Sequence, residues 1–451
     1  MFISLNLTWM LVVVFFALAF LGRIYFYRPL LAAALVLFLA PTYLLKIANW
    51  PLAFLEANLL VLFCCFFVDK IRRGELWRFI VGLKNLVGIG YFWPAVLILI
   101  GVFLSTIFSV DIKISAGIFK SWILEPIIFG IILFDILKTR RDLTLIVQSL
   151  FFSSVAVALA SLVYKLLNQL TFDGRLAAFY LSPNHLAMYL SPGLLIGLSL
   201  YFYIKKPHYR ALLFIAHCLL LIALYFTYSY SAWLAVSAAG FFIGWLFFWS
   251  KAQKRKKRIL MGVSFLLLIL ILLASQLGSE KLGNLLEWER SSWQSRQMIW
   301  QSANKILIDN WLLGVGPGLF QQYYLDYQRF FPIPYLEWAV PQPHNLFLAW
   351  WLYGGILGLV GFFGLIFYFF KTFFSAKQKS SFVPQKGGTS EDAPPPAKDS
   401  GRGQLLSIFL AAVIVYILIH GLTDTTYWKN DLALGFWSAI SLGYIAVRLD
   451  G

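Results

Sequence analysis

The feature that most constrains this chain is a succession of long apolar runs, each about 17 to 25 residues in length. An α-helix of that length spans the hydrocarbon core of a bilayer and satisfies all of its own backbone hydrogen bonds. Of the 451 residues, 60% are hydrophobic and only 13% are charged, whereas a soluble domain is roughly 25% charged. We therefore expect an all-α polytopic membrane protein, with the lipid bilayer as one of its partners.

The apolar runs predict about 13 membrane spans. They lie at 5–21, 30–47, 52–68, 91–109, 122–137, 144–167, 185–204, 211–229, 231–249, 259–275, 345–371, 404–423 and 431–448. The first two runs are the weakest, so about 12 spans is the alternative count. The first run lacks a basic start and a small-residue cleavage site, so we interpret it as a span and not as a signal peptide.

The distribution of positive charge indicates which loops face the cytoplasm. The loop at 251–258 contains six Lys or Arg residues and no acidic residue, which is typical of a cytoplasmic loop. Counting spans from there places 168–184, 276–343 and 424–430 outside the cytoplasm and the C-terminus inside. Basic loops of this kind also account for the net charge of +17, so we do not expect a nucleic-acid partner.

This topology divides the chain into five segments. They are an N-terminal transmembrane bundle (1–275), a large extracytoplasmic loop with an amphipathic helix (276–343), a transmembrane helix (344–375), a cytoplasmic linker (376–403) and C-terminal transmembrane helices (404–451). The linker is rich in Pro, Gly, Ser and charged residues. Such a composition cannot bury enough apolar surface to fold, so we predict that the linker is disordered.

The middle of the large outer loop, at 291–310, has the apolar spacing of an amphipathic helix. Arg296 projects from the middle of its apolar stripe, which would pack on the membrane domain. A guanidinium in that position needs an anionic partner, although snorkelling to water is the structural alternative. The stripe consists of Trp293, Trp300, Ala303 and Leu307.

The same loop continues into the sequence G-V-G-P-G at 314–318. Three glycines and a proline in five residues predict a tight turn. The backbone N–H groups at Gly316 and Gly318 suit an anion-binding nest, and a plain turn is the alternative. Aromatic residues farther along the loop suit anchoring at the membrane surface or, alternatively, stacking on sugar rings.

Two further polar segments stand at the mouths of apolar runs. Arg175 and Asn184 precede one run, and His344 and Asn345 follow two prolines to begin another. Capping of the helices behind them is the structural alternative for Asn184 and His344. Arginine, however, binds phosphate oxygens in bidentate fashion, and a neutral histidine can accept a proton from an attacking hydroxyl. Two arginines and a histidine outside the cytoplasm therefore suit a diphosphate ligand. We expect Asn345 to contribute to substrate binding and Asn184 to support the site.

Ionisable residues inside the apolar runs are costly and often functional. Glu125 and Asp424 lie near the outer ends of their spans, where they can support the site, and helix–helix hydrogen bonding is the alternative. The full set is Glu56, Glu125, Asp135, His217, His420 and Asp424, and for Asp135 and His217 we favour the structural role. The three cysteines form no disulfide framework or metal-binding spacing, so we expect no metal and no cofactor.

These polar segments resemble the O-antigen ligase and O-antigen polymerase superfamily of bacterial envelope glycosyltransferases. His344-Asn345, followed after nine residues by Gly355-Ile-Leu-Gly358, resembles the ligase pattern H-[NSQ]-x9-G-x-x-G. The sequence R-Q-M-I-W at 296–300 with G-V-G-P-G resembles the large-loop signature of the family. Gly-Arg at 174–175 with P-N-H-L-A at 183–187 resembles the segment before its mid-chain span. The likeness covers most of residues 100–448, and the extra N-terminal span and the charged linker are departures.

The resemblance implies a GT-C-like membrane fold and an inverting, metal-independent transfer from an undecaprenyl-diphosphate-linked glycan. Arg175 and Arg296 would hold the diphosphate, and His344 would deprotonate the hydroxyl of a glycan or lipid acceptor. The expected location is the bacterial cytoplasmic membrane, with the active site on its outer face. Ligase and polymerase differ in their acceptor, and the sequence does not identify the acceptor.

Two alternatives come from other classes of protein. A secondary transporter, like the bicarbonate-transporter-like relatives of the family, would place polar residues at the midplane on interrupted helices. Here the polar residues lie in outer loops, and we find no inverted repeat. A non-catalytic lipid-glycan binding protein would need Arg175 and Arg296 but not His344.

Overall fold

The computed structural model describes residues 7–47, 52–87, 90–248, 274–277, 292–330, 337–381 and 402–449. Within these ranges the regular structure is helical and contains no strand. The longer helices are α1 (Leu7–Tyr27), α2 (Pro29–Phe38), α3 (Phe54–Arg72), α4 (Leu76–Val87), α5 (Phe92–Ile107), α7 (Glu125–Ile136), α8 (Arg140–Leu166), α9 (Pro183–Gly197), α10 (Pro207–Phe226), α11 (Tyr230–Phe248), α14 (Ser292–Asp309), α16 (Leu346–Ser381), α17 (Arg402–His420) and α18 (Asn430–Arg448). Shorter helical elements are η1 (Ala40–Leu44), α6 (Ile112–Ile118), the π-helical η2 (Phe119–Leu124), η3 (Leu198–Phe202), α15 (Phe320–Tyr327) and η5 (Gln328–Phe330).

Six helical segments in the described ranges are long and apolar enough to cross a membrane. They are Ile112–Ile136, Arg140–Leu166, Pro183–Phe202, Pro207–Phe226, Tyr230–Phe247 and Leu346–Ala376, and shorter apolar helices occupy Leu11–Tyr27, Pro29–Phe38, Phe92–Ile107 and Leu405–His420. The chain is therefore an all-α polytopic membrane protein, as expected. The count of 12 or 13 spans stays a prediction, because most of the expected span 259–275 lies outside the described residues.

Two helix ends differ from the expected boundaries. The run at 30–47 is helical only to Phe38 and continues as the short turn η1, because Pro41 cannot extend an α-helix that precedes it. Helix α16 continues to Ser381, past residue 376 where we placed the start of the linker, since the Ala, Lys and Gln residues there favour helix. Residues 382–401 of the expected linker lie outside the described part of the chain.

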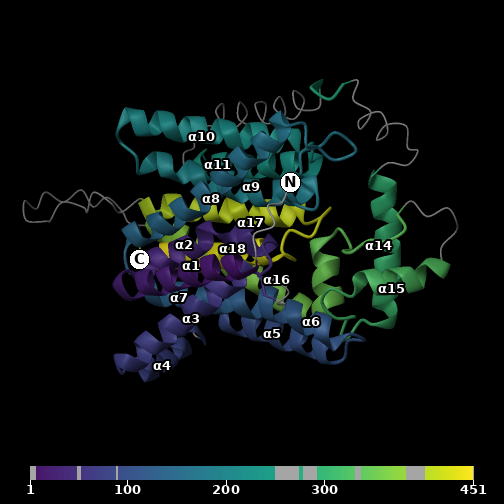
Figure 1. The fold of residues 1–451 in the computed structure, drawn as a ribbon, viewed down its shortest axis with the longest axis horizontal. Coiled ribbons are helices and arrows are strands. Elements are labelled where there is room, and N and C mark those ends of the chain that lie inside the picture. The colour runs from purple at the N-terminus through teal and green to yellow at the C-terminus, as the bar shows by residue number, and fades with distance from the viewer. Residues whose placement is uncertain are drawn as a thin grey trace, which may run out of the picture.

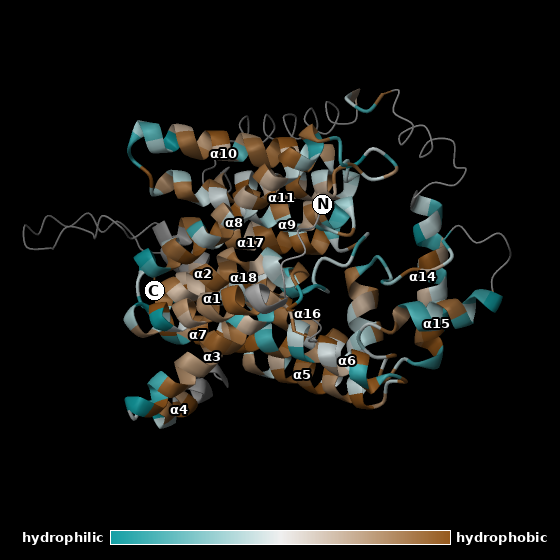
Figure 2. Ribbon diagram, viewed as in Figure 1, coloured by the Kyte–Doolittle hydropathy of each residue, from teal (hydrophilic) through white to brown (hydrophobic). Residues whose placement is uncertain are grey.

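The bundle helices lie side by side, and α14 and α15 lie across one end of them (Figure 1). Figure 2 shows the corresponding contrast in hydropathy, with mainly hydrophobic residues in the bundle and more hydrophilic residues on α14 and α15. Helix α14 falls within the predicted range 291–310. Its side chains Ala303, Ile306 and Leu307 are buried, whereas Trp293 is 41% exposed and packs edge-on against Trp300. The buried face of α14 is therefore shifted from the predicted stripe toward Ile306.

Helix α16 packs along α5 at very short range. A Cβ atom at Gly101 of α5 would lie 2.4 Å from the backbone nitrogen of Gly358 and 2.6 Å from the carbonyl oxygen of Gly354. Small residues spaced four apart allow the backbones of membrane helices to approach in this way. Gly355 has a positive φ of 61°, and a Cβ atom there would lie 2.2 Å from the carbonyl oxygen of Leu312. At Gly355, α16 therefore packs directly against the segment that follows α14.

We expect Gly101→Ala to destabilise the protein by about 1–3 kcal/mol, because the added methyl group collides with the backbone of α16. Thermal unfolding of the detergent-purified protein, followed by circular dichroism, measures this change. Gly240→Ala on α11 is the matched control, since nothing lies within 4 Å of the added Cβ there. Equal melting temperatures for the two variants would contradict the close packing of α5 on α16.

Candidate active site

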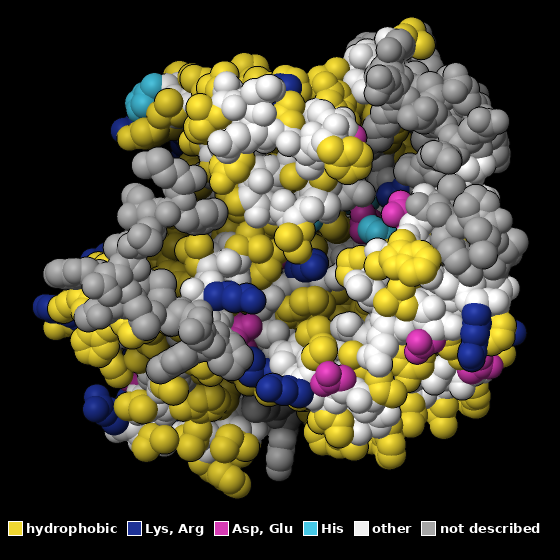
Figure 3. All heavy atoms as spheres, turned by 45° about the vertical axis from the view of Figure 1, so that its right-hand side comes forward, with side chains coloured by type: hydrophobic (Ala, Val, Ile, Leu, Met, Phe, Trp, Pro, Cys, Tyr) yellow, Lys and Arg dark blue, Asp and Glu magenta, His cyan; other side chains and the backbone are white. Residues whose placement is uncertain are grey.

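Polar side chains from four separate segments meet at the end of the bundle where α14 and α15 lie. One of these segments is the loop at 421–429, between α17 and α18, which the other segments contact directly or through Asn184. Figure 3 shows a recess on this face, in which a histidine, acidic side chains and basic side chains gather between the bundle and the α14–α15 region. The residues brought together are Arg175, Asn184, Arg296, His344, Asn345 and Asp424.

Asp424 lies at the centre of this group and is only 3% exposed. Its Oδ1 atom lies 3.2 Å from Nδ1 of His344 and accepts the backbone N–H of Thr425 at 2.9 Å. Its Oδ2 atom accepts a hydrogen bond from Nδ2 of Asn184 at 3.0 Å. Because both oxygens have partners, the carboxylate is fixed in orientation and its burial is compensated.

The charge of Asp424 is set by its neighbours. Burial alone would raise the pKa of this carboxyl, but its contact with His344, followed by the nearby His420 and the positive charge of Arg296, holds the pKa well below its usual range. Asp424 is therefore ionised and accepts the Nδ1 proton of His344. This hydrogen bond assigns the tautomer in which Nε2 of His344 carries the free lone pair.

His344 is held in place by backbone contacts as well as by Asp424. It adopts a left-handed backbone with φ of 45°, which is uncommon for a residue other than glycine and marks a constrained position. Its carbonyl oxygen accepts a hydrogen bond from Nε1 of Trp300 on α14 at 3.3 Å. The His344 side chain is 34% exposed, so one ring edge meets Asp424 and part of the ring stays accessible.

Asn345 caps helix α16 and fastens it to the loop at 421–429. Its Oδ1 atom accepts the backbone N–H groups of Phe347 and Leu348 at 2.9 and 3.0 Å. Its Nδ2 atom donates to the carbonyl oxygen of Leu422 at 2.9 Å. Both the oxygen and the nitrogen of this amide thus contact the protein itself and fix the backbone next to His344. The expected role of Asn345 in substrate binding stays a prediction.

Arg175 reaches the same group from the loop before α9. Its Nε atom donates to the Thr227 carbonyl at 2.8 Å, and its Nη2 atom donates to Oδ1 of Asn184 at 2.7 Å. The Asp173 carboxylate lies 3.8 Å from Nη1. Asn184 therefore links Arg175 to Asp424, and the chain of contacts continues to His344.

Arg296 approaches from α14, where its Nε atom donates to the carbonyl oxygen of Thr423 at 2.9 Å. The two arginines are close enough to repel each other. Burial lowers the pKa of Arg175, Asp173 opposes the change, and the positive charge of Arg296 adds to it. Two partly buried guanidinium groups that repel each other are stabilised by an anion bound between them.

Gly316 and Gly318 have contacts of a different kind. Both have positive φ, and a Cβ atom would lie 2.6 Å from Cβ of Ser109 at Gly316 and 2.3 Å from Cδ1 of Ile118 at Gly318. The carbonyl of Pro317 between them accepts a hydrogen bond from Ser115 at 3.1 Å. The turn thus packs against the α5–α6 region. This close packing leaves no room for side chains at Gly316 and Gly318 and accounts for the glycines there.

Glu125 lies in a second polar group, away from Asp424. Its Oε1 atom is 3.8 Å from Nζ of Lys120, which is also paired with Glu56 at 2.9 Å. Glu56 in turn accepts a hydrogen bond from Asn430 at 3.1 Å. Among the described residues, Glu125 is therefore connected to the start of α18 and has no bond to the His344 group.

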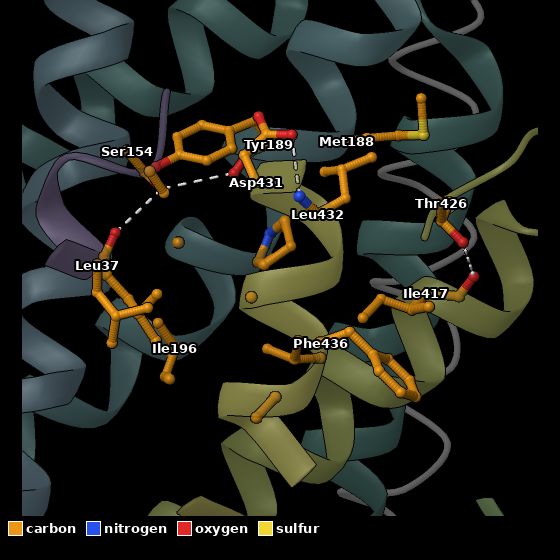
Figure 4. Close-up of a pocket in the computed structure, with 17 residues that line it drawn as sticks. Leu37, Ser154, Met188, Tyr189, Ile196, Ile417, Thr426, Asp431, Leu432 and Phe436 are labelled. Carbon is orange, nitrogen blue, oxygen red and sulfur yellow. Dashed lines mark hydrogen bonds between the residues drawn. The ribbon is translucent and has the colours of Figure 1, made fainter. Parts of the chain in front are cut away.

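A third polar group was not predicted from the sequence. Asp431 is 2% exposed, accepts a hydrogen bond from Tyr180 at 3.1 Å and lies 3.4 Å from Nε2 of His185, which also contacts Tyr43 at 3.3 Å. The sequence feature that could have revealed this group is Asp431 itself, an acidic residue at the start of the apolar run 431–448. Figure 4 shows Asp431 beside Tyr189 at a cavity of about 50 Å³, which is otherwise lined mainly by apolar side chains such as Phe436.

The remaining ionisable residues from the spans have structural partners. Asp135 pairs with Lys70 at 2.8 Å, and His217 contacts the Leu213 carbonyl at 2.8 Å and stacks on Phe151. In the described ranges, no three His, Cys, Asp or Glu side chains are grouped as a metal site would require.

Comparison with known families was consistent with the resemblance seen in the sequence. Residues 214–363, about a third of the chain, match the family described as O-antigen ligase. The match includes Arg296, His344 and Asn345, whereas Arg175 and Asp424 lie outside it. No curated protein matched the chain. Over residues 214–363, the resemblance to the O-antigen ligase and polymerase superfamily is thereby confirmed.

Proposed function

We propose that this chain, whose residues 214–363 match the O-antigen ligase family, transfers a glycan from undecaprenyl diphosphate to an acceptor hydroxyl at the outer face of the bacterial cytoplasmic membrane. The observation that supports this proposal most is the pair of His344 and Asp424, 3.2 Å apart, with Arg175 and Arg296 in the same group. A base and two cations are the groups that such a transfer requires without a metal ion.

In the proposed reaction, Nε2 of His344 accepts the proton of the acceptor hydroxyl as its oxygen attacks the anomeric carbon of the donor sugar. The bond between that carbon and the phosphate oxygen breaks, and the electron pair leaves with the diphosphate. Attack opposite the leaving group inverts the anomeric centre. The protonated imidazole is stabilised by Asp424, and the charge on the leaving diphosphate is stabilised by Arg175 and Arg296.

A polymerase of the same superfamily is the second candidate. It would use the same bond changes but would take its acceptor hydroxyl from another lipid-linked glycan. The family match favours an enzyme of the ligase or polymerase type and gives no support to a secondary transporter. The recess that gathers the polar residues is at one end of the bundle (Figure 3), whereas transporter sites lie near the midplane.

The test is a transfer assay with the full-length protein in liposomes, supplied with undecaprenyl-diphosphate-linked glycan extracted from the producing cells. We expect release of undecaprenyl diphosphate together with a product whose mass equals acceptor plus glycan. A glycan attached to a core lipid or protein identifies a ligase, and a lengthened lipid-linked glycan identifies a polymerase. We also expect EDTA to leave the rate unchanged, because arginines take the role of a metal. No glycan transfer with either kind of acceptor would overturn the proposal.

A further inference from the structure

Lys429 is the last residue of the loop at 421–429, immediately before α18. Its side chain is partly buried, and its ammonium group lies 5.7 Å from the centre of the Trp122 ring. The described part of the chain provides no carboxylate within ion-pair distance of this ammonium and no side-chain hydrogen bond to it. Burying an ammonium group without an anionic partner destabilises the folded protein. The presence of Lys429 at this position therefore suggests a function other than stability.

The carboxylates around Lys429 already have other partners. Asp424 binds His344 and Asn184, and Asp431 accepts the hydroxyl of Tyr180. Glu56, which contacts the neighbouring Asn430, is paired with Lys120 at 2.9 Å.

The electrostatics of Lys429 agree with this geometry. Burial lowers the pKa of its ammonium group, and the more distant charges of Asp431 and Asp424 oppose the change without reversing it. The positive charge at Lys429 is thus only partly balanced within the protein. An anion that binds beside it would supply the missing partner.

The loop at 421–429 places Lys429 at the same end of the bundle as the candidate active site. The Thr423 carbonyl of this loop holds Arg296, and Asp424 holds His344. Near its other end, the Trp428 carbonyl accepts a hydrogen bond from Gln342, two residues before His344. Trp122 is fixed beneath the ammonium by a hydrogen bond from its Nε1 atom to Asn430 at 2.6 Å.

We propose that the ammonium group of Lys429 binds an anionic oxygen of the donor's diphosphate, as a third cation beside Arg175 and Arg296. This inference rests on the proposed function and names a further substrate-binding residue for it. Arg175 already directs Nε and Nη2 to protein oxygens, so it has limited capacity to bind the substrate. Each phosphate of the donor carries a negative charge, and Lys429 can compensate a charge that the arginines leave.

The experiment measures binding of undecaprenyl diphosphate, without a glycan, to the detergent-purified full-length protein by native mass spectrometry. The variants are Lys429→Met, Lys429→Gln and Lys429→Arg, and Arg296→Met serves as the comparison at an arginine of the candidate site. Lys305→Met is the matched control, because Lys305 also lies over an aromatic ring, that of Phe330 at 5.5 Å, but is exposed on α14. Donor and acceptor KM values for the same variants are then measured in liposomes.

We expect Lys429→Met and Lys429→Gln to weaken undecaprenyl diphosphate binding about 10-fold to 100-fold, as loss of a charge-assisted hydrogen bond does. The donor KM should rise while the acceptor KM stays constant, and Lys429→Arg and Lys305→Met should bind as wild type does. Unchanged binding in a folded Lys429→Gln protein would overturn the inference, as would a change in the acceptor KM alone. If the wild-type protein does not bind undecaprenyl diphosphate, the proposed function itself is wrong. If Arg296→Met weakens binding and the Lys429 variants do not, the proposed function stands and the role of Lys429 is wrong.

Discussion

Replacing His344 by Ala is expected to reduce glycan transfer by about 10²- to 10⁴-fold, the range that a positioned general base contributes. Without Nε2 of His344, no side chain in the group around Asp424 is placed to accept the hydroxyl proton, because Asp424 itself is buried and already bonded on both oxygens. The measurement compares lipid-linked donor and transferred glycan, by gel and mass spectrometry, in cells that lack their own copy of the protein.

The left-handed backbone at His344 requires a second variant in this experiment. Alanine at a φ of 45° is strained, so a lost activity could reflect a displaced helix start. Asparagine tolerates positive φ, and His344→Asn should be as inactive as His344→Ala while reaching the membrane at wild-type levels. His208→Ala, at an exposed position in the first turn of α10, is the control and should transfer normally.

The alternative of a lipid-glycan binding protein makes the opposite prediction. In that case the arginines would matter and His344 would be dispensable, so the glycan profile of His344→Asn would match wild type. That outcome, with the protein present in the membrane, would remove the catalytic role from His344 and leave it as a residue at the start of α16.

Sequence reasoning predicted the components of the candidate site better than their connections. The apolar run length reflects the bilayer, so the membrane class follows from composition alone. The polar residues at the mouths of the runs were also recognisable, because charge near an apolar segment needs a reason. Nothing in the local spacing, however, shows that Asn184 bridges Arg175 to Asp424, since these contacts join segments that are far apart in the chain.

The glycine turn illustrates the limit of local interpretation. A cluster of glycines indicates positive φ or close approach, but it does not say whether the approaching group is a phosphate or another part of the protein. At Gly316 and Gly318 the nearest atoms belong to Ser109 and Ile118. Lys429, in contrast, belongs to no sequence motif and was not predicted. Its lack of a nearby carboxylate partner within the described ranges becomes visible only in the three-dimensional structure.

Replacing Asp424 by Asn is expected to lower kcat by about 10²- to 10⁴-fold with little change in the donor KM, because the acid acts on His344 and not on substrate. An amide can donate a hydrogen bond to Nδ1 of His344 and thereby stabilise the tautomer whose Nε2 carries a proton. It also removes the negative charge that stabilises the protonated imidazole during transfer. Asp424→Glu, which keeps the charge, should recover part of the rate.

Asp424→Asn should also reduce stability at neutral pH. The pKa of Asp424 is held well below its usual range in the folded protein, so its ionised form stabilises the fold at any pH above the unfolded-state value, about 4. This contribution is lost only as the pH falls below about 4 toward the folded-state pKa. The difference in melting temperature between wild type and Asp424→Asn should therefore persist from pH 7 to pH 5 and shrink in stronger acid.

The exposed residue Asp326 on α15 provides the control for both measurements. Asp326→Asn should leave kcat and the melting temperature unchanged, because the charge it removes is solvated and its loss costs little. A purely structural role for Asp424 would lower the melting temperature but leave kcat per folded molecule intact. Loss of kcat at temperatures where Asp424→Asn remains folded, together with partial recovery in Asp424→Glu, therefore separates the orientation of His344 from the stability of the loop that carries it.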